Sequence, residues 1–81
     1  MIDVTVNGQS RRVADGTTVA QLLQQLAVHP QQVVVEVNVQ IIKREQREAT
    51  ILQAGDVVEI VRFVGGGSRY TAFDRGVVAL L

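Results

Sequence analysis

Cysteine and tryptophan are absent from this chain of 81 residues, and histidine, lysine, proline and tyrosine occur once each. Without cysteine there are no disulfides, thiolate nucleophiles or thiolate metal ligands. Eight basic and eight acidic side chains cancel, whereas nucleic-acid-binding proteins usually carry a basic excess. The composition therefore favours a binding or carrier module over an enzyme, and we expect neither a metal site nor a nucleic-acid partner.

Long apolar runs are also absent. No stretch approaches the roughly 20 residues that span a bilayer, and the N-terminus lacks the basic and apolar regions of a signal peptide. We therefore expect a cytoplasmic protein without a membrane partner. The chain is instead rich in branched side chains, with 16 valines and five isoleucines, which favour strands over helices.

A hairpin is predicted at the start of the chain. Apolar and polar residues alternate over residues 2–6, as in a strand with one buried face. Asn7-Gly8 follows, and this pair favours a two-residue turn because both residues tolerate positive φ. A second strand is therefore predicted over residues 10–14.

One amphipathic helix is predicted to begin at Thr18. Thr18 and Gln21 have the spacing of a capping box, and apolar residues recur at helical intervals from Val19 onwards. The helix should end near Val28, because Pro30 disfavours helical geometry at the residue before it.

Three further strands are predicted after the helix. Residues 33–38 form a dense β-branched run, typical of a strand buried on both faces, and residues 41–42 form a short strand. The last strand spans residues 56–64, with Val58 and Ile60 facing the core. This β-β-α-β-β-β order predicts an α+β fold of the β-grasp (ubiquitin-like) type, a mixed sheet of four to five strands with one main helix.

Most charged side chains are expected at the surface. Lys43, Arg44 and Arg47 form a small basic cluster in an exposed loop, where two glutamates offset their charge. Glu36 and Glu59 lie on separate strands, and we interpret them as surface charges of the sheet rather than as a catalytic pair. No residue is therefore predicted to be catalytic.

Three of the seven glycines stand together as Gly65-Gly66-Gly67, directly after the last strand. A glycine run can be a flexible linker, a phosphate-binding loop or a narrow tail that enters a tunnel in another enzyme. The phosphate loop is disfavoured, because no Gly-Lys-Ser/Thr follows and Tyr70 stands where such a motif has glycine.

Several segments, in this order and at these spacings, resemble the ThiS family of sulfur carriers over residues 1–67. They are Val4-Thr5-Val6-Asn7-Gly8, Asp15-Gly16-Thr17-Thr18-Val19, Val35-Glu36-Val37-Asn38, Gly55-Asp56-Val57-Val58-Glu59-Ile60-Val61 and Phe63-Val64-Gly65-Gly66-Gly67.

The resemblance implies a function without catalysis by the chain itself. An E1-like, ThiF-like enzyme uses ATP and magnesium to adenylate Gly67, and a sulfur donor enzyme then converts the adenylate to a thiocarboxylate. Thiazole synthase (ThiG-like) receives that sulfur for the thiazole ring of thiamin. Gly65 and Gly66 give the tail its reach, while Val61, Phe63 and Val64 are candidates for docking on partners.

Two features depart from the family pattern. Val39 stands in the turn after Asn38, where the family commonly has glycine, so we expect that hairpin to differ locally because valine resists positive φ. Residues 68–81 follow the glycines and leave Gly67 without a free carboxylate. We interpret this extension as a segment removed by a protease, a reading-frame artefact or a permanent segment of a protein that no longer carries sulfur.

Alternatives stay open for the extension and for the function. The apolar residues from Tyr70 to Leu80 or Leu81 are spaced to line one helical face, which would pack near Val61 and Phe63. The chain could also be a related carrier for molybdopterin or cysteine synthesis, or a β-grasp protein-interaction module whose tail is permanent.

Overall fold

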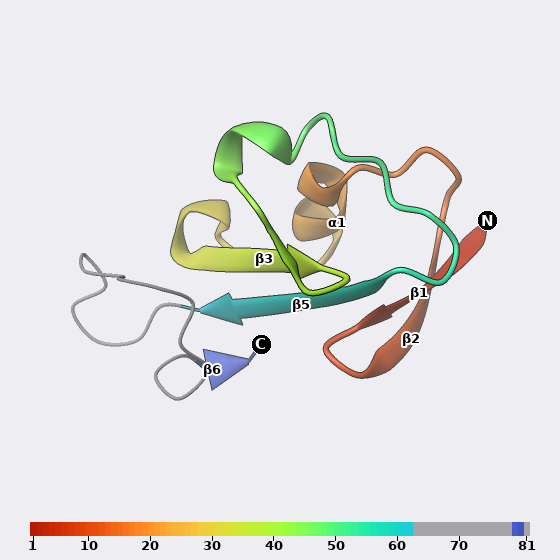
Figure 1. Ribbon diagram of the computed structural model, residues 1–81, viewed down its shortest axis with the longest axis horizontal. Coiled ribbons are helices and arrows are strands. Elements are labelled where there is room, and N and C mark those ends of the chain that lie inside the picture. Colours follow the sequence, from red (N-terminus) through yellow and green to blue (C-terminus); the bar gives the residue numbers. More distant parts are fainter. Residues whose placement is uncertain (63–78, 81) are drawn as a thin grey trace.

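The computed structural model describes residues 1–62 and 79–80, in which an α-helix packs on one face of a mixed β-sheet (Figure 1). The strand order is β2-β1-β5-β3-β4, and β6 pairs with β5 outside this order. β1 and β5 are parallel, and the other paired strands are antiparallel. The predicted β-grasp order is therefore confirmed. The elements are β1 (Ile2–Val6), β2 (Gln9–Val13), α1 (Val19–Gln25), the 3₁₀ helix η1 (Pro30–Gln32), β3 (Val33–Val37), β4 (Gln40–Ile42), the 3₁₀ helix η2 (Arg44–Gln46), β5 (Val57–Arg62) and β6 (Ala79–Leu80).

The first hairpin forms as predicted, with β2 beginning and ending one residue earlier than expected. Asn7 and Gly8 make its turn with φ angles of 48° and 85°. Both residue types reach this left-handed region at low cost, so the turn follows directly from the sequence.

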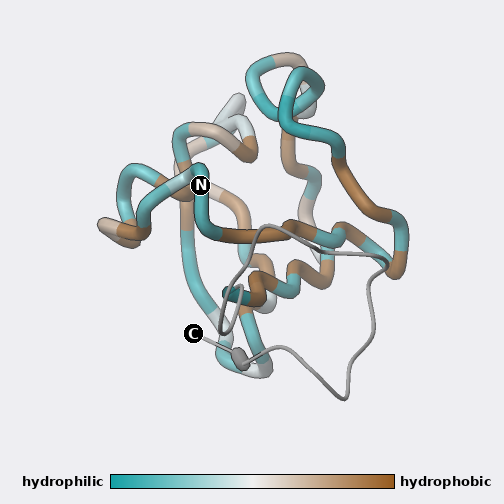
Figure 2. The backbone as a smooth tube through the Cα atoms, turned by 90° about the vertical axis from the view of Figure 1, so that its left-hand side faces the viewer, coloured by the Kyte–Doolittle hydropathy of each residue, from teal (hydrophilic) through white to brown (hydrophobic). Residues whose placement is uncertain are grey.

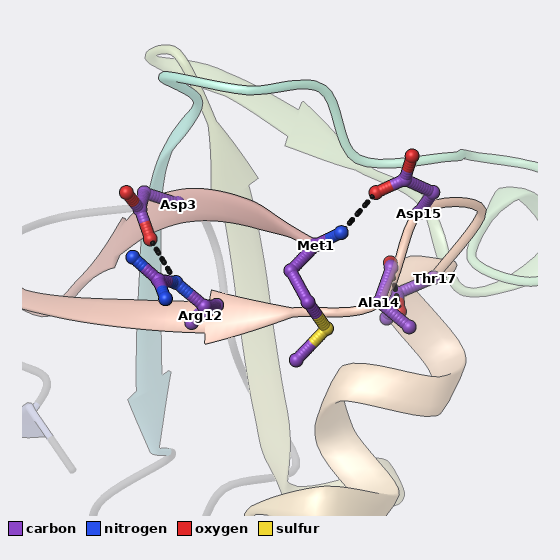
Figure 3. Close-up of polar contacts among 6 residues, drawn as sticks. All are labelled: Met1, Asp3, Arg12, Ala14, Asp15 and Thr17. Carbon is purple, nitrogen blue, oxygen red and sulfur yellow. Dashed lines mark hydrogen bonds and ion pairs between the residues drawn. The ribbon is translucent and has the colours of Figure 1, made fainter.

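Polar contacts lie within the first hairpin, within the loop before α1, and between this loop and the first residue (Figure 3). The amino group of Met1 lies 2.8 Å from Oδ1 of Asp15, and Nε of Arg12 donates to Asp3 over 3.1 Å. The Thr17 hydroxyl donates a 2.7 Å hydrogen bond within the same loop. The hydrogen bond from the N-terminal amine, reinforced by its charge, lowers the pKa of Asp15.

Helix α1 begins as predicted and ends earlier. Thr18 accepts from the backbone of Gln21 while the Gln21 side chain accepts from the backbone of Thr18, which confirms the capping box. The helix ends at Gln25 rather than near Val28, because Ala27 leaves the helical region with a φ of 59°. The left-handed conformation of Ala27, three residues before Pro30, therefore ends the helix.

The core lies between α1 and the sheet. Every residue of β3 is buried, as predicted for this strand, and Val58 and Ile60 of β5 are fully buried with it. In Figure 2 the backbone alternates between brown and teal over short distances, as expected for strands with one apolar face. The buried side chains that form the helix-side core are Val4, Val6, Val13, Val19, Leu22, Leu23, Val33, Val35, Val37, Leu52, Val58 and Ile60.

The β3–β4 turn contradicts our expectation for Val39. Asn38 and Val39 adopt φ angles of 52° and 71°, so the valine takes the left-handed conformation that glycine would take. The turn is fixed from outside, because the backbone and side chain of Asn38 both bond to Val57. The tight turn thus persists and Val39 carries the strain.

Two expectations about charged residues were wrong. Arg47, predicted in a solvated loop, is buried, and its Nη1 and Nη2 each donate over 2.8 Å, to the carbonyls of Pro30 and Val33. Glu36, predicted on the sheet surface, is buried as well. The exposed positions expected for Lys43 and Arg44 are confirmed.

The end of the extension is also not helical. Ala79 and Leu80 form strand β6, which pairs with the end of β5, as Figure 1 shows. The prediction of a helical face was therefore wrong at Leu80, although this residue does lie beside Val61. Residues 63–78, with the rest of that predicted face, lie outside the described residues. Within residues 1–62 and 79–80, no helix is long and apolar enough to cross a membrane.

Candidate functional site

The candidate site is the end of β5, since this strand leads into the glycine segment. β5 lies between β1 and β3 in the middle of the sheet. Its pairing with β3 continues from Val58 to Arg62, whereas its pairing with β1 covers only Val57 and Val58. After Val58, β5 is therefore paired with β3 along one edge, and along its other edge it extends beyond the end of β1.

Beyond the end of β1, the side chain of Asn7 forms hydrogen bonds with the backbone of β5. The backbone N–H of Ile60 donates to Oδ1 of Asn7 over 2.8 Å, and Nδ2 of Asn7 donates to the carbonyl of Ile60 over 3.1 Å. One amide group thus satisfies both backbone groups of a fully buried residue, which a longer β1, parallel to β5, would satisfy with two of its residues. From the sequence, Asn7 is predicted only in the turn, and the signal for its second role is the presence of Asn, rather than Gly or Asp, at this position.

A second asparagine fixes the beginning of β5. The N–H of Val57 donates to Oδ1 of Asn38 over 2.9 Å, and the N–H of Asn38 donates to the carbonyl of Val57 over 2.8 Å. Nδ2 of Asn38 also donates to Asp56 over 3.0 Å. β5 is therefore held at its start and near its end by asparagines from two hairpins, which makes it a stable base for the segment that follows.

The predicted site residues lie mostly beyond this base. Val61 is described: it is 2% exposed, yet it does not belong to the helix-side core, because it lies on the opposite face of the sheet, paired with Val34. Its role in docking stays a prediction. The other predicted residues fall outside the described residues, and they are Phe63, Val64, Gly65, Gly66 and Gly67.

The described residues offer little other chemistry. Nowhere in residues 1–62 and 79–80 do three or more His, Asp or Glu side chains gather where they could hold a metal ion. A cleft of about 710 Å³ separates α1 from η2, and Arg47 lines it. Burial, and to a lesser degree the charge of Arg44, lowers the pKa of Arg47. Two backbone carbonyls already engage this guanidinium, so its role is to join η2 to the start of β3.

The sheet is mixed, with β1 to β5 in one continuous order, the short β6 beside β5 and one helix on one face. Its central strand β5 leads along the chain to three glycines, and this arrangement defines a β-grasp domain with a glycine tail. The ThiS family model matches residues 4–67. The chain belongs to the ThiS family.

Relatives and solved structures agree with this assignment. The sulfur carrier protein ThiS of Escherichia coli K12 is 33% identical over 66 residues, which cover 82% of this chain and 100% of the relative. A crystal structure of the thiamine biosynthesis protein ThiS from Geobacter metallireducens superposes with a TM-score of 0.73 at 39% identity, covering 82% of this chain and 100% of that one.

Two longer relatives are also similar. A thiazole synthase of Magnetococcus marinus is 35% identical over 77 residues, and one of Paramagnetospirillum magneticum is 37% identical over 65. The matches cover 95% and 80% of this chain but only 24% and 20% of those proteins, so the chain spans less than a quarter of their length. Because 77 of 81 residues leave at most four unmatched, the first match extends to residue 77 at least and passes Gly67.

Proposed function

We propose that this chain is a sulfur carrier for synthesis of the thiamin thiazole ring, with Gly67 as the residue that carries the sulfur. The observation behind the proposal is the family match, which ends at residue 67, the last of the three glycines. The full-length similarity to the E. coli carrier supports it. We further propose that residues 1–67 are the carrier domain, that residues 68–81 are an extension, and that the carrier works in the cytoplasm.

The chain contributes a carboxyl group and its placement, and partner enzymes supply the catalysis. Once Gly67 is the last residue, a ThiF-like enzyme joins its carboxylate to AMP from ATP, bound with magnesium, and releases pyrophosphate. A sulfur donor enzyme then delivers sulfur to the acyl carbon, and AMP leaves. The two preceding glycines carry no side chains, so the terminus can enter a confined active site.

A thiazole synthase is the proposed acceptor of the sulfur. Two thiazole synthases contain a segment that resembles this chain, which supports a functional link between the two activities. Val61, Phe63 and Val64 are proposed to contact these partners, because they lie within four residues of the first glycine. Exposure of Gly67 requires a protease that cuts between Gly67 and Ser68.

The test compares residues 1–67 with the full chain in the presence of an adenylating enzyme, ATP, magnesium and a sulfur source. Intact mass should show one oxygen replaced by sulfur in the 1–67 form only. A Gly67→Ala variant of that form is the matched control and should react poorly, since its Cβ would meet the walls of a narrow channel. If neither form gains sulfur while the E. coli carrier does, the proposal is refuted.

A second candidate follows from the match that passes Gly67. Residues 68–77 have counterparts in the Magnetococcus thiazole synthase, which favours a natural extension over an artefact. In this candidate the extension links the carrier to a synthase or persists as an interaction segment. Intact mass of the protein purified from its own cells separates the candidates, because a processed carrier ends at Gly67 and a linked one does not.

A further inference from the structure

One edge of β5 is filled by three different groups in succession. Backbone groups along a strand alternate between its two edges. The N–H of Asn7 donates to the carbonyl of Val58 over 2.9 Å, and the Asn7 side chain bonds to Ile60. The backbone N–H and C=O groups of Val58 and Ile60 therefore point toward the β1 side of β5. Arg62 is the next residue whose N–H and C=O point the same way.

Strand β6 lies at this third position. It runs antiparallel to β5, with Ala79 opposite Arg62 and Leu80 opposite Val61. β1 cannot reach this point, because its pairing with β5 stops at Val58. The chain's own C-terminal strand thus fills the part of the edge that β1 leaves open, three residues before the first glycine of the tail.

We propose that β6 is an intramolecular latch on the edge of β5, which keeps the uncut chain from presenting this edge to an activating partner. The proposal rests on the proposed function of Gly67. A partner protein can add a strand to an open strand edge. β5 is the strand next to the glycine tail in the chain, so a partner that binds the tail would lie close to its end. While Ala79 is paired with Arg62, that position is taken.

The latch is weak enough to be released. β6 has only two residues, and Arg62–Ala79 is its one pair on the hydrogen-bonding side. A pair this short forms because 16 intervening residues, 63–78, keep the two strands together and give β6 a high effective concentration. Cleavage after Gly67 removes this link, so a two-residue strand would dissociate. One cut would then create the carboxylate and free the edge.

Amide hydrogen exchange measured by NMR tests the latch in the full chain. Ala79→Pro removes the N–H opposite Arg62, and Ala79→Val is the matched control that keeps it. The lost N–H faces the Arg62 carbonyl, so in the proline variant β6 should leave β5 more often. The Arg62 amide, which faces the carbonyl of residue 79, should then exchange roughly five- to tenfold faster, the factor that corresponds to the one net hydrogen bond lost. The Ile60 amide, bonded to Asn7, should be unchanged and reports that the fold is intact.

Binding of the adenylating enzyme tests the consequence. Gly67 is internal in the full chain and in the proline variant, so neither reacts and affinity alone is compared. The proline variant, and a chain that ends at residue 78, should bind roughly five- to tenfold more tightly than the full chain. Equal Arg62 exchange in all proteins would overturn the latch, and equal binding would overturn its blocking effect. Failure of the proposed function is a separate result, since it concerns sulfur gain by residues 1–67.

Discussion

Replacing Asn7 should destabilise the end of β5 more than its place in a surface turn suggests. The Asn7 amide satisfies the N–H and C=O of Ile60, a residue with no exposed surface, over 2.8 and 3.1 Å. Asn7→Gly keeps a residue that tolerates the observed φ of 48° and removes only the amide. Asn7→Ala removes the amide and adds the strain of a left-handed alanine.

The expected loss follows from two hydrogen bonds worth about 1 kcal/mol each, or about 2 kcal/mol for Asn7→Gly. Asn7→Ala should lose about 1 kcal/mol more through backbone strain. For a domain of this size each kcal/mol shifts Tm by about 4–8 °C, so Asn7→Gly should lower Tm by roughly 8–16 °C. Asn38→Gly is the matched control, because it is also a left-handed asparagine bonded to β5 but is exposed, and its loss should be about half as large.

Thermal unfolding followed by circular dichroism measures these losses, and hydrogen exchange of the Ile60 amide locates them. That amide should become the most accelerated in β5 for Asn7→Gly and remain protected for Asn38→Gly. A Tm within about 2 °C of the parent chain, together with a protected Ile60 amide, would refute the reasoning, because another group would then be satisfying the strand edge.

Four further predictions, some with a control substitution, concern other parts of the structure. Val39→Gly should raise stability by about 1 kcal/mol, since it relieves a left-handed valine that is 78% exposed; urea denaturation that shows a loss would contradict this. Arg47→Ala should cost about 2–3 kcal/mol by freeing two carbonyls, and Arg47→Met, which restores apolar packing, should cost less. Thr18→Ala should cost about 1 kcal/mol of folding stability through loss of the helix cap. Thr5→Ala is the control, because Thr5 lies in strand β1 and caps no helix. The pKa of Asp15 is lowered from its ordinary value of 3.8, so the ionised carboxylate contributes to folding stability above that pH. This contribution is lost as the pH falls through the folded-state pKa. Asp15→Asn should therefore be slightly less stable than the parent chain at pH 7 and equally stable in acid.

The sequence predicted those parts of the fold that depend on neighbours in the chain. The hairpin at Asn7-Gly8 and the capping box of Thr18 are local, and both are confirmed. The burial of Val58 and Ile60 follows from alternation within one strand. Arg47 and Glu36 could not be placed in this way, because their burial depends on segments that come together only in the folded sheet, such as the carbonyl of Val33 that Arg47 contacts 14 positions away.

The contacts at the end of β5 could not be predicted from the sequence, because they also join segments that are distant in the chain. Asn7 and Ile60 lie 53 positions apart, so no local pattern links them. The Asn7-Gly8 turn ends β1 at Val6, and the Asn7 side chain then satisfies Ile60 without a longer strand. A longer β1 would continue along β5 to Arg62 and exclude β6 from its place. A turn near the start of the chain therefore determines which edge is open beside the glycine tail at its other end.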